Sequence, residues 1–563
     1  MEVCYDRSMM SNDWYHEVKQ YTERLVGMRS VSPGEGEIRV AQEIVRLLRS
    51  DNLEMAYTES GLNALEGDLY GRQNAYAFLR GEGGSTVVLL GHFDTVDTQD
   101  YGALEPWALE PAVLAERYDE LLPANERRAD LSDWMFGRGA ADMKSGVAIN
   151  IALMRRFARE ARQASLPISV LMIATPDEEN NSAGVLQAVH LLLQLRERYK
   201  LNYIGLLNTD YVTALYPGDE HRYLYSGSIG KLLPGFLCIG TTSHAGDPFN
   251  GLDANLLAAE LIRDLSMNDE LCDAVPGQMA APPVTLRASD LKSHYDTQLP
   301  QSAYFYLNVL TLTTQPAQLL ARLEKRAQDV LTQLLQRIDQ TERRWRQAHG
   351  ERQELLRPRS GSVLSYDELY TGTVGHLGKE RVDAELLQEW RKWSATVDGR
   401  DRSLHLARRL WTLSGRQGPA VLIYFAPPYY PAVAPMAGPL QAAVDTVIKA
   451  HPEVQLEQYP YFPYLSDISY TSLDPDIDLS KLQANMPVWQ PTNQAPLPGA
   501  YSLPLSEIQS LNIPAINWGP FGRGAHQRDE AVLMSYTFGT LPQLLYETIK
   551  YLYRIAPDEE VIR

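Results

Sequence analysis

The chain has little cysteine, no long apolar run and a deficit of positive charge. Only three cysteines occur in 563 residues, and Cys4, Cys238 and Cys272 lie far apart. This excludes a metal cluster held by thiolates and suits a reducing compartment. No stretch reaches the 18 uninterrupted apolar residues typical of a membrane span, and MEVCYDRSMMSNDWYHEVKQ at the N-terminus lacks the apolar segment of a signal peptide. We therefore expect a cytoplasmic protein with no membrane partner.

Acidic residues clearly outnumber basic ones. The 71 Asp and Glu against 52 Lys and Arg give a formal net charge of −19, which argues against nucleic acid as a partner. The apolar fraction of 44% is ordinary for a globular protein. At this length we expect two or three domains.

Apolar strand patterns alternate with helical patterns over residues 1–225. STVVLLGHF, PISVLMIAT and NYIGLLN are typical of buried strands, and residues 145–162 are typical of a helix. This alternation predicts an α/β domain with a mixed, largely parallel sheet that is flanked by helices.

The pattern changes near residue 226. Residues 226–415 hold strand patterns such as AYFYLNVLTLT, a long helical pattern, and a charge-dense region with two more helical patterns. The apolar run AVLIYF then restarts the α/β pattern. We therefore predict that 226–415 is an α+β domain inserted between two parts of the first domain, 1–225 and 416–563. The proline-rich stretch 471–504 is expected to be a long surface loop.

Histidine and carboxylate residues follow the apolar strands at several places. In HFDTV, His92 and Asp94 are two residues apart on a strand end, so their side chains should share a face. Open α/β sheets bind ligands at the carboxyl ends of their strands. The other places contribute Asp142, the run from Asp177 to Glu179, Asp210 and His526.

Each of these residues has a simpler explanation when it is taken alone. His92 and Asp94 could be solvated, Asp142 could cap the helix that follows it, and His526 could be an exposed loop residue. Five such places on one edge of one sheet are improbable by chance. Histidines with carboxylates and without cysteine suit zinc, manganese or cobalt.

The succession of HFDTV, GRGAADMKSG, DEE, an isolated Asp and a late GAH…DE resembles the M20 family of di-metal peptidases and deacylases. The resemblance implies a zinc-peptidase-like catalytic domain with an inserted lid, here 226–415, through which some members dimerise. In its size and its aromatic, proline-rich C-terminal half, the chain is most similar to the arginine-utilization (RocB-type) branch.

The resemblance implies two metal sites that share one carboxylate. His92, Asp142 and Asp210 would hold one ion, and Asp142, Glu179 and His526 would hold the other. Zinc is the expected metal, with cobalt or manganese as alternatives.

The resemblance also assigns three residues to catalysis. Asp94 would accept the second ring N–H of His92 and so orient it. Glu178 would be the general base. His244, in the lid motif TTSHAG, would stabilise the oxyanion from the same subunit or from a partner.

Three further features are expected beside the site. The peptide bond after Asp142 would be cis, as in the family. Asp177 should be structural rather than a ligand. Ser466 and Asp467, in YPYFPYLSDISY, could lie near the substrate or belong to the packing.

The function implied is a metal-dependent hydrolase that cleaves the amide bond of a small N-acyl amino acid or dipeptide-like substrate with a metal-bridging water, in arginine or amino-acid utilization. An exopeptidase on short peptides and a non-catalytic protein that binds an amino-acid derivative are the alternatives. The chain departs from many relatives at Asn308, in a lid strand that lacks the usual arginine, and in a long connection between His92 and Asp142. Substrate identity and oligomeric state therefore stay open.

Overall fold

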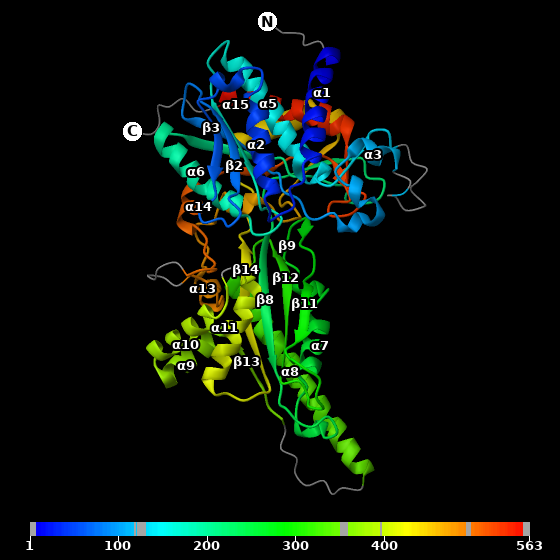
Figure 1. Cartoon of the computed structure of the whole chain (residues 1–563), viewed down its shortest axis with the longest axis vertical. Helices are drawn as coiled ribbons and strands as arrows, with labels where there is room; N and C mark the ends of the chain where they lie inside the picture. The colour runs from blue at the N-terminus through cyan, green and yellow to red at the C-terminus, as the bar shows by residue number, and fades with distance from the viewer. Residues whose placement is uncertain are drawn as a thin grey trace. The chain divides into compact units, whose positions relative to one another are not determined.

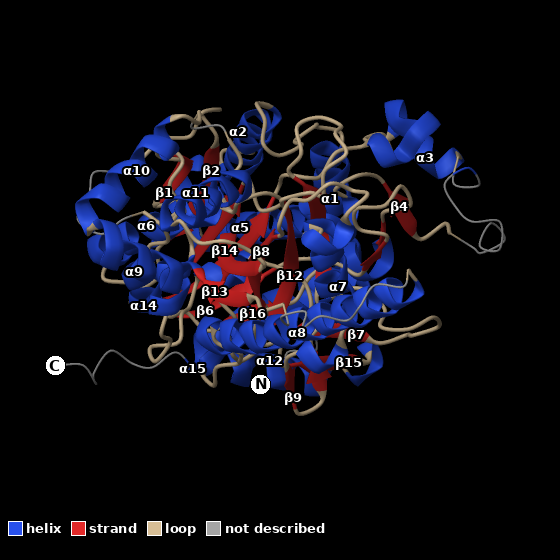
Figure 2. Ribbon diagram, turned by 90° about the horizontal axis from the view of Figure 1, so that it is seen from below, coloured by secondary structure: helices blue, strands red, loops and turns tan. Residues whose placement is uncertain are grey.

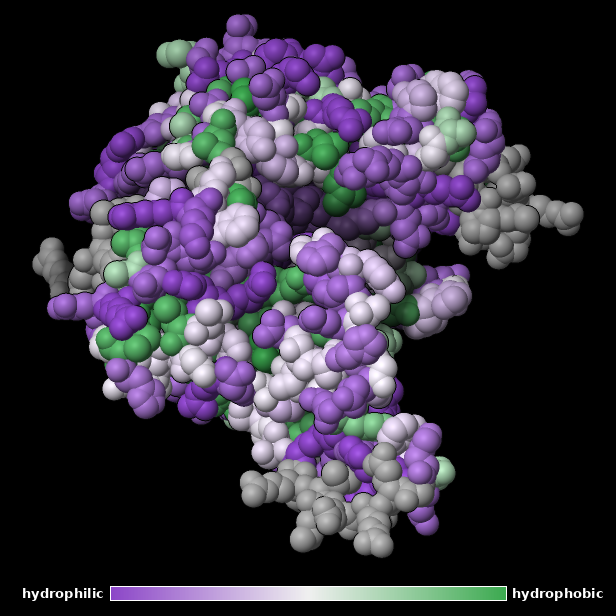
Figure 3. All heavy atoms as spheres, turned by 60° about the horizontal axis from the view of Figure 1, so that its bottom comes forward, coloured by the Kyte–Doolittle hydropathy of each residue, from purple (hydrophilic) through white to green (hydrophobic). Residues whose placement is uncertain are grey.

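The computed structural model describes residues 7–117, 120, 131–349, 359–394, 397–490 and 497–555. None of the helices in this part of the chain combines the length and the apolar character that crossing a bilayer requires. The face drawn in Figure 3 is mostly hydrophilic, in keeping with a net charge of −19. The chain divides into unit 1 (Met1–Ser228, Val433–Asp474 and Pro504–Arg563) and unit 2 (Ile229–Ala432 and Pro475–Leu503).

Unit 1 is built on an eight-stranded sheet with the order β1-β2-β5-β3-β6-β16-β7-β15. Strand β3 is parallel to both β5 and β6, and β6 is parallel to β16. Strand β2 runs antiparallel to both of its neighbours, β1 and β5. The predicted mixed sheet is confirmed. The strands are β1 (Glu59–Ala64), β2 (Gln73–Leu79), β3 (Ser85–His92), β5 (Ser169–Thr175), β6 (Asn202–Asn208), β7 (Arg222–Tyr225), β15 (Leu456–Tyr459) and β16 (Ala515–Asn517).

Helices cover both faces of this sheet (Figure 1). Helix α6 lies on one side of β2 and β3, and α2 and α5 lie on the other side, where they share one apolar core with α1, α12 and α15. Every residue of β3 and β5 is buried, because these central strands are covered on both faces. The helices are α1 (Arg7–Val26), α2 (Gly36–Arg49), α3 (Pro111–Glu116), α5 (Ser145–Ala161), α6 (Ala183–Tyr199), α12 (Pro439–Ala450), α14 (Leu505–Leu511) and α15 (Leu541–Ile555).

A second, three-stranded sheet of unit 1 joins distant parts of the chain. It has the order β17-β18-β4, with β4 (Trp134–Phe136), β17 (Gly522–Arg523) and β18 (Ala531–Leu533). The long connection after β3 packs against it through a small core that includes Tyr101, Phe136 and Ala531. This sheet therefore holds the late loop between β17 and β18 beside the turn that follows β4.

Unit 2 is a five-stranded sheet covered by helices, with the order β11-β12-β8-β14-β13. Figures 1 and 2 show α7 and α8 on one side of its strands and α9, α10 and α11 on the other. The sheet strands are β8 (Gly230–Ile239), β11 (Val284–Asp290), β12 (Ser302–Thr311), β13 (Ser362–Ser365) and β14 (Ala420–Tyr430), beside the hairpin of β9 (Ala274–Val275) and β10 (Gln278–Met279). The helices are α7 (Ala254–Leu265), α8 (Pro316–Ala348), α9 (Tyr366–Leu377), α10 (Lys379–Arg391), α11 (Gly399–Ser414) and α13 (Ser480–Asn485).

Three details of unit 2 differ from the sequence-based expectations. The run AVLIYF lies in β14, which pairs with β8 in unit 2 instead of restarting the sheet of unit 1. An apolar run predicts a buried strand but not the sheet to which it belongs. In its described residues, the charge-dense region holds the three helices α9, α10 and α11 rather than two, because Gly378 alone separates α9 from α10 and hardly interrupts the pattern. The proline-rich stretch contains α13, while residues 491–496 lie outside the described part.

Replacing Gly519 with alanine is expected to destabilise unit 1. A Cβ at this position would lie 1.9 Å from the backbone oxygen of Asp210, so the chain beyond β16 and the chain beyond β6 would have to separate. The free energy of unfolding should fall by roughly 1–3 kcal/mol in urea denaturation. Gly61→Ala is the control, because the nearest neighbour of its Cβ would be the guanidinium of Arg49 at 3.7 Å, an ordinary van der Waals distance. Equal stability of the two variants would contradict this packing.

Candidate metal centre

The carboxyl ends of three neighbouring strands meet at one edge of the large sheet. His92 is the last residue of β3, Glu178 and Glu179 follow β5, and Asp210 follows β6. These strands are parallel, and parallel strands end at the same edge. Because of this topology the structure brings together the side chains that the sequence places far apart.

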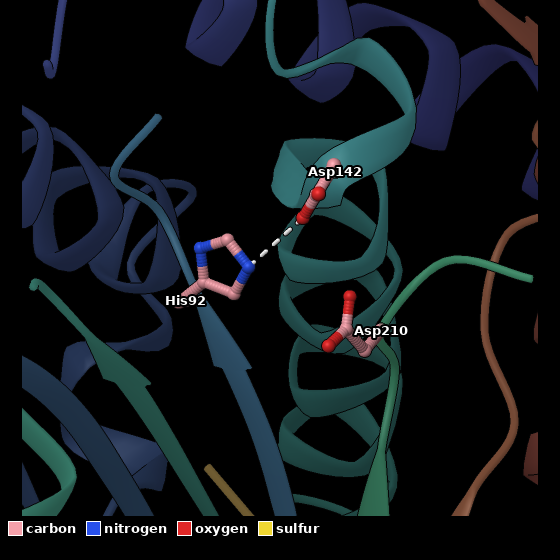
Figure 4. A group of neighbouring side chains, drawn as sticks. All are labelled: His92, Asp142 and Asp210. Carbon is pink, nitrogen blue, oxygen red and sulfur yellow. Dashed lines mark hydrogen bonds and ion pairs between the residues drawn. The ribbon is translucent and has the colours of Figure 1, made fainter. Parts of the chain in front are cut away.

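His92, Asp142 and Asp210 form the first group of donor atoms. One ligand atom from each lies within 4.8 Å of the others. The Nε2 atom of His92 is 3.1 Å from Oδ1 of Asp142. Figure 4 shows Asp210, at the end of its strand, directed toward the other two side chains. All three residues are buried.

Asp142, Glu179 and His526 form the second group, which meets the same 4.8 Å limit. The Nε2 atom of His526 lies 2.9 Å from Oε1 of Glu179 and 3.3 Å from Oδ2 of Asp142. Asp142 therefore faces one histidine with each of its oxygens. The His526 side chain is 50% exposed, so the second group is the one that solvent reaches.

The turn that carries Asp142 lies between β4 and α5. The Asp142–Met143 peptide bond is cis, as expected. The backbone N–H groups of Ala141 and Asp142 both donate to Oε1 of Glu530 at 3.1 Å. Glu530 was not among the predicted site residues, although it closes the GAH…DE motif.

Asp94 is fully buried and makes contacts that the sequence did not predict. Its two carboxylate oxygens accept the backbone N–H groups of Glu178 and Glu179 at 3.1 Å each. Its approach to His92 Nδ1 is longer, at 3.5 Å from Oδ1, while its own carbonyl oxygen lies 3.3 Å from the same nitrogen. Asp94 thus aligns the segment after β5 as well as facing the histidine ring.

Glu178 lies beside the first group with a side chain that is 10% exposed, and its Oε2 atom is 4.0 Å from His92 Nε2. The residue before it, Asp177, has the left-handed φ of 71° and contacts the guanidinium of Arg72. Asp177 also accepts a hydrogen bond from Ser32 at 3.0 Å. Asp177 is therefore tied into the fold rather than directed at either donor group.

Burial and like charges control the protonation of the carboxylates. Burial raises the pKa of Glu178 well above its usual value, and neighbouring negative charges raise it further. Burial and the charge of Asp142 do the same for the pKa of Asp210. Burial also acts to raise the pKa of Asp142, but hydrogen bonds from both histidines outweigh it and hold that pKa below its usual range.

The pKa values of both histidines are raised, whereas burial alone would lower them. Burial acts to lower the pKa of His92, but hydrogen bonds to Asp142 and Asp94 raise it well above its usual value. Hydrogen bonds to Asp142 and Glu179 raise the pKa of His526 to about 11. The carboxylates thus create a site that favours positive charge.

This donor set fits divalent cations. Imidazole nitrogens and carboxylate oxygens are ligands of zinc, manganese and cobalt, and no cysteine takes part in either group. Each group could hold one ion, with Asp142 common to both.

Ser466 and Asp467 are buried rather than open to a substrate. Ser466 Oγ accepts a hydrogen bond from Asn208 at the end of β6, and Asp467 accepts one from Thr175 at the end of β5. Both residues are buried and bind the ends of β6 and β5, which favours the packing alternative.

His244 lies in unit 2 and is exposed. Its Nδ1 atom accepts the backbone N–H of Gly246 at 3.0 Å. In a neutral imidazole the proton is then on Nε2, so the ring presents an N–H donor away from its own loop.

The chain is similar to known proteins over most of its length. Residues 88–480 match the profile of peptidase family M20/M25/M40. The chain is 32% identical to the protein YqjN of Bacillus subtilis over 548 residues, which cover 94% of this chain and 95% of that protein. It is 30% identical to protein RocB of the same organism over 95% of this chain and 94% of RocB. The fold is similar to the dipeptidase Dug1p of Saccharomyces cerevisiae, with a TM-score of 0.52, 12% identity and 98% of each chain covered.

Chelation of bound metal is expected to make the protein less stable as the pH rises. Without cations, the folded-state pKa of Glu178 lies above its unfolded value near 4.5, and that of Asp210 lies above 3.8. Between the unfolded and folded pKa values of these groups, the folded state binds more protons than the unfolded state. The free energy of unfolding therefore falls as the pH rises through that range. His526, with a pKa raised from 6.5 to about 11, extends the same trend, and Asp142 acts only below 3.8.

The measurement is chemical denaturation of chelated and zinc-reconstituted protein between about pH 5 and pH 9. The stability gap between the two forms should widen toward high pH. A gap that stays constant over this range would contradict the charge balance described for the site.

Proposed function

Because the chain belongs to the M20 family of metal-dependent peptidases and deacylases, we propose that it hydrolyses the amide bond of a small N-acyl amino acid or dipeptide-like substrate. It is a metal-dependent amidohydrolase of the RocB-type branch; its substrate and the roles of its residues are the proposal. The observation that carries the proposal is that two donor groups share one carboxylate, with the largely covered Glu178 beside them. The metal ligands in this proposal are His92, Asp142, Glu179, Asp210 and His526.

Divalent ions in these groups, with zinc the expected metal, supply Lewis acidity that acidifies water and polarises a carbonyl oxygen. Glu178 accepts the proton of the attacking water and returns it to the leaving nitrogen. Burial raises the pKa of Glu178, and a raised pKa makes its carboxylate a stronger base toward the water proton. Asp94 holds the backbone of Glu178 and so sets the direction of this carboxylate.

His244 is proposed as the donor to the oxyanion that forms on the substrate carbonyl. The tautomer fixed by Gly246 leaves an Nε2–H group available for this purpose. Such a donor typically contributes a factor of about 10²–10³ to kcat.

A place in arginine or amino-acid utilization is supported by the 30% identity to RocB over nearly the whole chain. Asn308 lies on β12, on the strand where an arginine of many relatives is expected. Without that arginine, recognition of a free carboxylate in the manner of a carboxypeptidase is disfavoured.

The nearest alternative is an exopeptidase with the same fold and the same donor groups. A panel of N-acyl amino acids and dipeptides separates the two, since turnover of peptides alone would exclude the deacylase. A non-catalytic binding protein would require tight binding of an amino-acid derivative by metal-free protein.

We also propose that two copies of the chain associate through unit 2. Strand β11 is the edge of the five-stranded sheet, so within the described part of the chain one row of its backbone groups has no neighbouring strand in that sheet. Val284 and Leu286 on this strand are 42% and 54% exposed, and Met267 beside it is 71% exposed. An exposed edge with apolar side chains is a surface on which a second copy can pair.

Replacing Glu178 with glutamine is expected to lower kcat by roughly 10²–10⁴-fold while both metal ions stay bound, because the amide cannot accept the proton. Metal content by elemental analysis is measured together with turnover of an N-acyl-arginine and a dipeptide. Glu66→Gln, at an exposed position, is the control and should behave as wild type. Full activity of Glu178→Gln would exclude this residue as the base.

His244→Ala should lower kcat by about 10²–10³-fold without changing metal content. If His244 acts across a dimer, mixing this variant with Glu178→Gln should restore roughly a quarter of wild-type activity, since half of the pairs are mixed and each has one intact site. Two inactive variants that never complement each other would contradict action across the dimer. An active His244→Ala would contradict the role itself.

A further inference from the structure

Glu530 joins the loop of His526 to the turn of Asp142. It is 1% exposed, and its Oε1 atom accepts the N–H groups of both Ala141 and Asp142 at 3.1 Å. Its other oxygen accepts a hydrogen bond from Arg138 at 2.8 Å. One carboxylate therefore holds the backbone of the shared ligand from within the same loop region that supplies His526.

Arg138 is also 1% exposed and anchors this carboxylate to the long connection after β3. Its guanidinium donates to Asp100 at 2.6 Å and to the backbone oxygen of Asp97 at 3.0 Å, and it lies over the ring of Tyr101 at 5.3 Å. All three contacts come from residues 97–117, which belong to the long connection between His92 and Asp142.

The 97–117 segment is itself held by apolar packing. Tyr101, Leu104, Ala108 and Leu114 form a small buried core with Phe136 and Ala531. Ala531 is the neighbour of Glu530 in the chain. The segment therefore packs against Ala531, and Arg138 connects the same segment to Glu530.

We propose that Arg138 and Glu530 are positioning residues. They fix the Asp142 carboxylate so that it contributes to both donor groups, and the 97–117 segment supports them. A buried ion pair contributes little net stability, because desolvation offsets the attraction. Its fixed geometry, in contrast, sets the place of the two N–H groups and hence of Asp142. This inference rests on the proposed function, since the position of Asp142 matters to catalysis only if it is a shared ligand.

The test compares Glu530→Gln and Arg138→Met with wild type, using Co²⁺ as the probe. The glutamine keeps an oxygen for the two N–H groups but turns an NH₂ toward the guanidinium of Arg138, and the methionine removes the charge at similar length. Partners that hold a ligand typically change metal affinity or activity by 10–100-fold. We expect Co²⁺ affinity, measured against a chromophoric chelator, to fall by about that factor. The visible spectrum of the bound Co²⁺ should shift, and kcat should fall while KM stays within about twofold of wild type.

Arg155→Met is the matched control. Arg155 is also 1% exposed and pairs with Glu17 and Asp51, away from both donor groups. The Arg155→Met variant should lower the melting temperature, as Arg138→Met does, but it should leave the Co²⁺ spectrum and affinity unchanged. Asp100→Asn, at a carboxylate that is 33% exposed, is the milder variant to use if Arg138→Met does not fold.

The outcomes separate this inference from the proposed function. The pair would be merely structural if the variants lower only the melting temperature and keep the Co²⁺ affinity and spectrum of wild type. This outcome applies to Glu530→Gln together with Arg138→Met, or with Asp100→Asn if Arg138→Met does not fold. Wild-type protein that binds two ions but hydrolyses no amide would overturn the proposed function and leave the positioning effect on metal binding measurable. Wild-type protein that binds no metal would overturn both.

Discussion

The two oxygens of Asp142 face two histidines from distant parts of the chain, and the site depends on this shared carboxylate. His92 lies 3.1 Å from Oδ1 and His526 lies 3.3 Å from Oδ2. For both contacts to exist, the end of β3, the turn after β4 and the loop between β17 and β18 must meet at one point. The acidic groups gathered there repel one another, so positive charge, whether on the histidines or on metal ions, is what holds the arrangement together.

The strands that position the site were predictable because their apolar runs are easy to recognise in the sequence. Fully apolar runs such as STVVLLGHF indicate strands buried on both faces, and parallel strands place His92, Glu178 and Asp210 at one edge. The five ligands assigned by resemblance lie in the two donor groups, and the cis bond follows Asp142. Their roles in metal binding and catalysis stay predictions.

The remaining features depend on contacts that sequence patterns do not encode. Nothing in AVLIYF tells which sheet β14 joins, and the single residue Gly378 between two helices leaves almost no break in periodicity. Asp94 was expected to face the His92 ring, and its oxygens also accept the N–H groups of Glu178 and Glu179, which no pattern predicts. Glu530 stands in a quoted motif, but its partners are Arg138 and the backbone N–H groups of Ala141 and Asp142, which lie 388 to 392 residues earlier in the chain.

The central claim, that one carboxylate is shared by two metal ions, is tested most directly by anomalous X-ray diffraction from zinc-loaded crystals, measured on both sides of the zinc absorption edge. The account predicts two anomalous peaks, one beside His92 and Asp210 and one beside Glu179 and His526, with a different oxygen of Asp142 next to each. A single peak, or two peaks of which only one contacts Asp142, would contradict it.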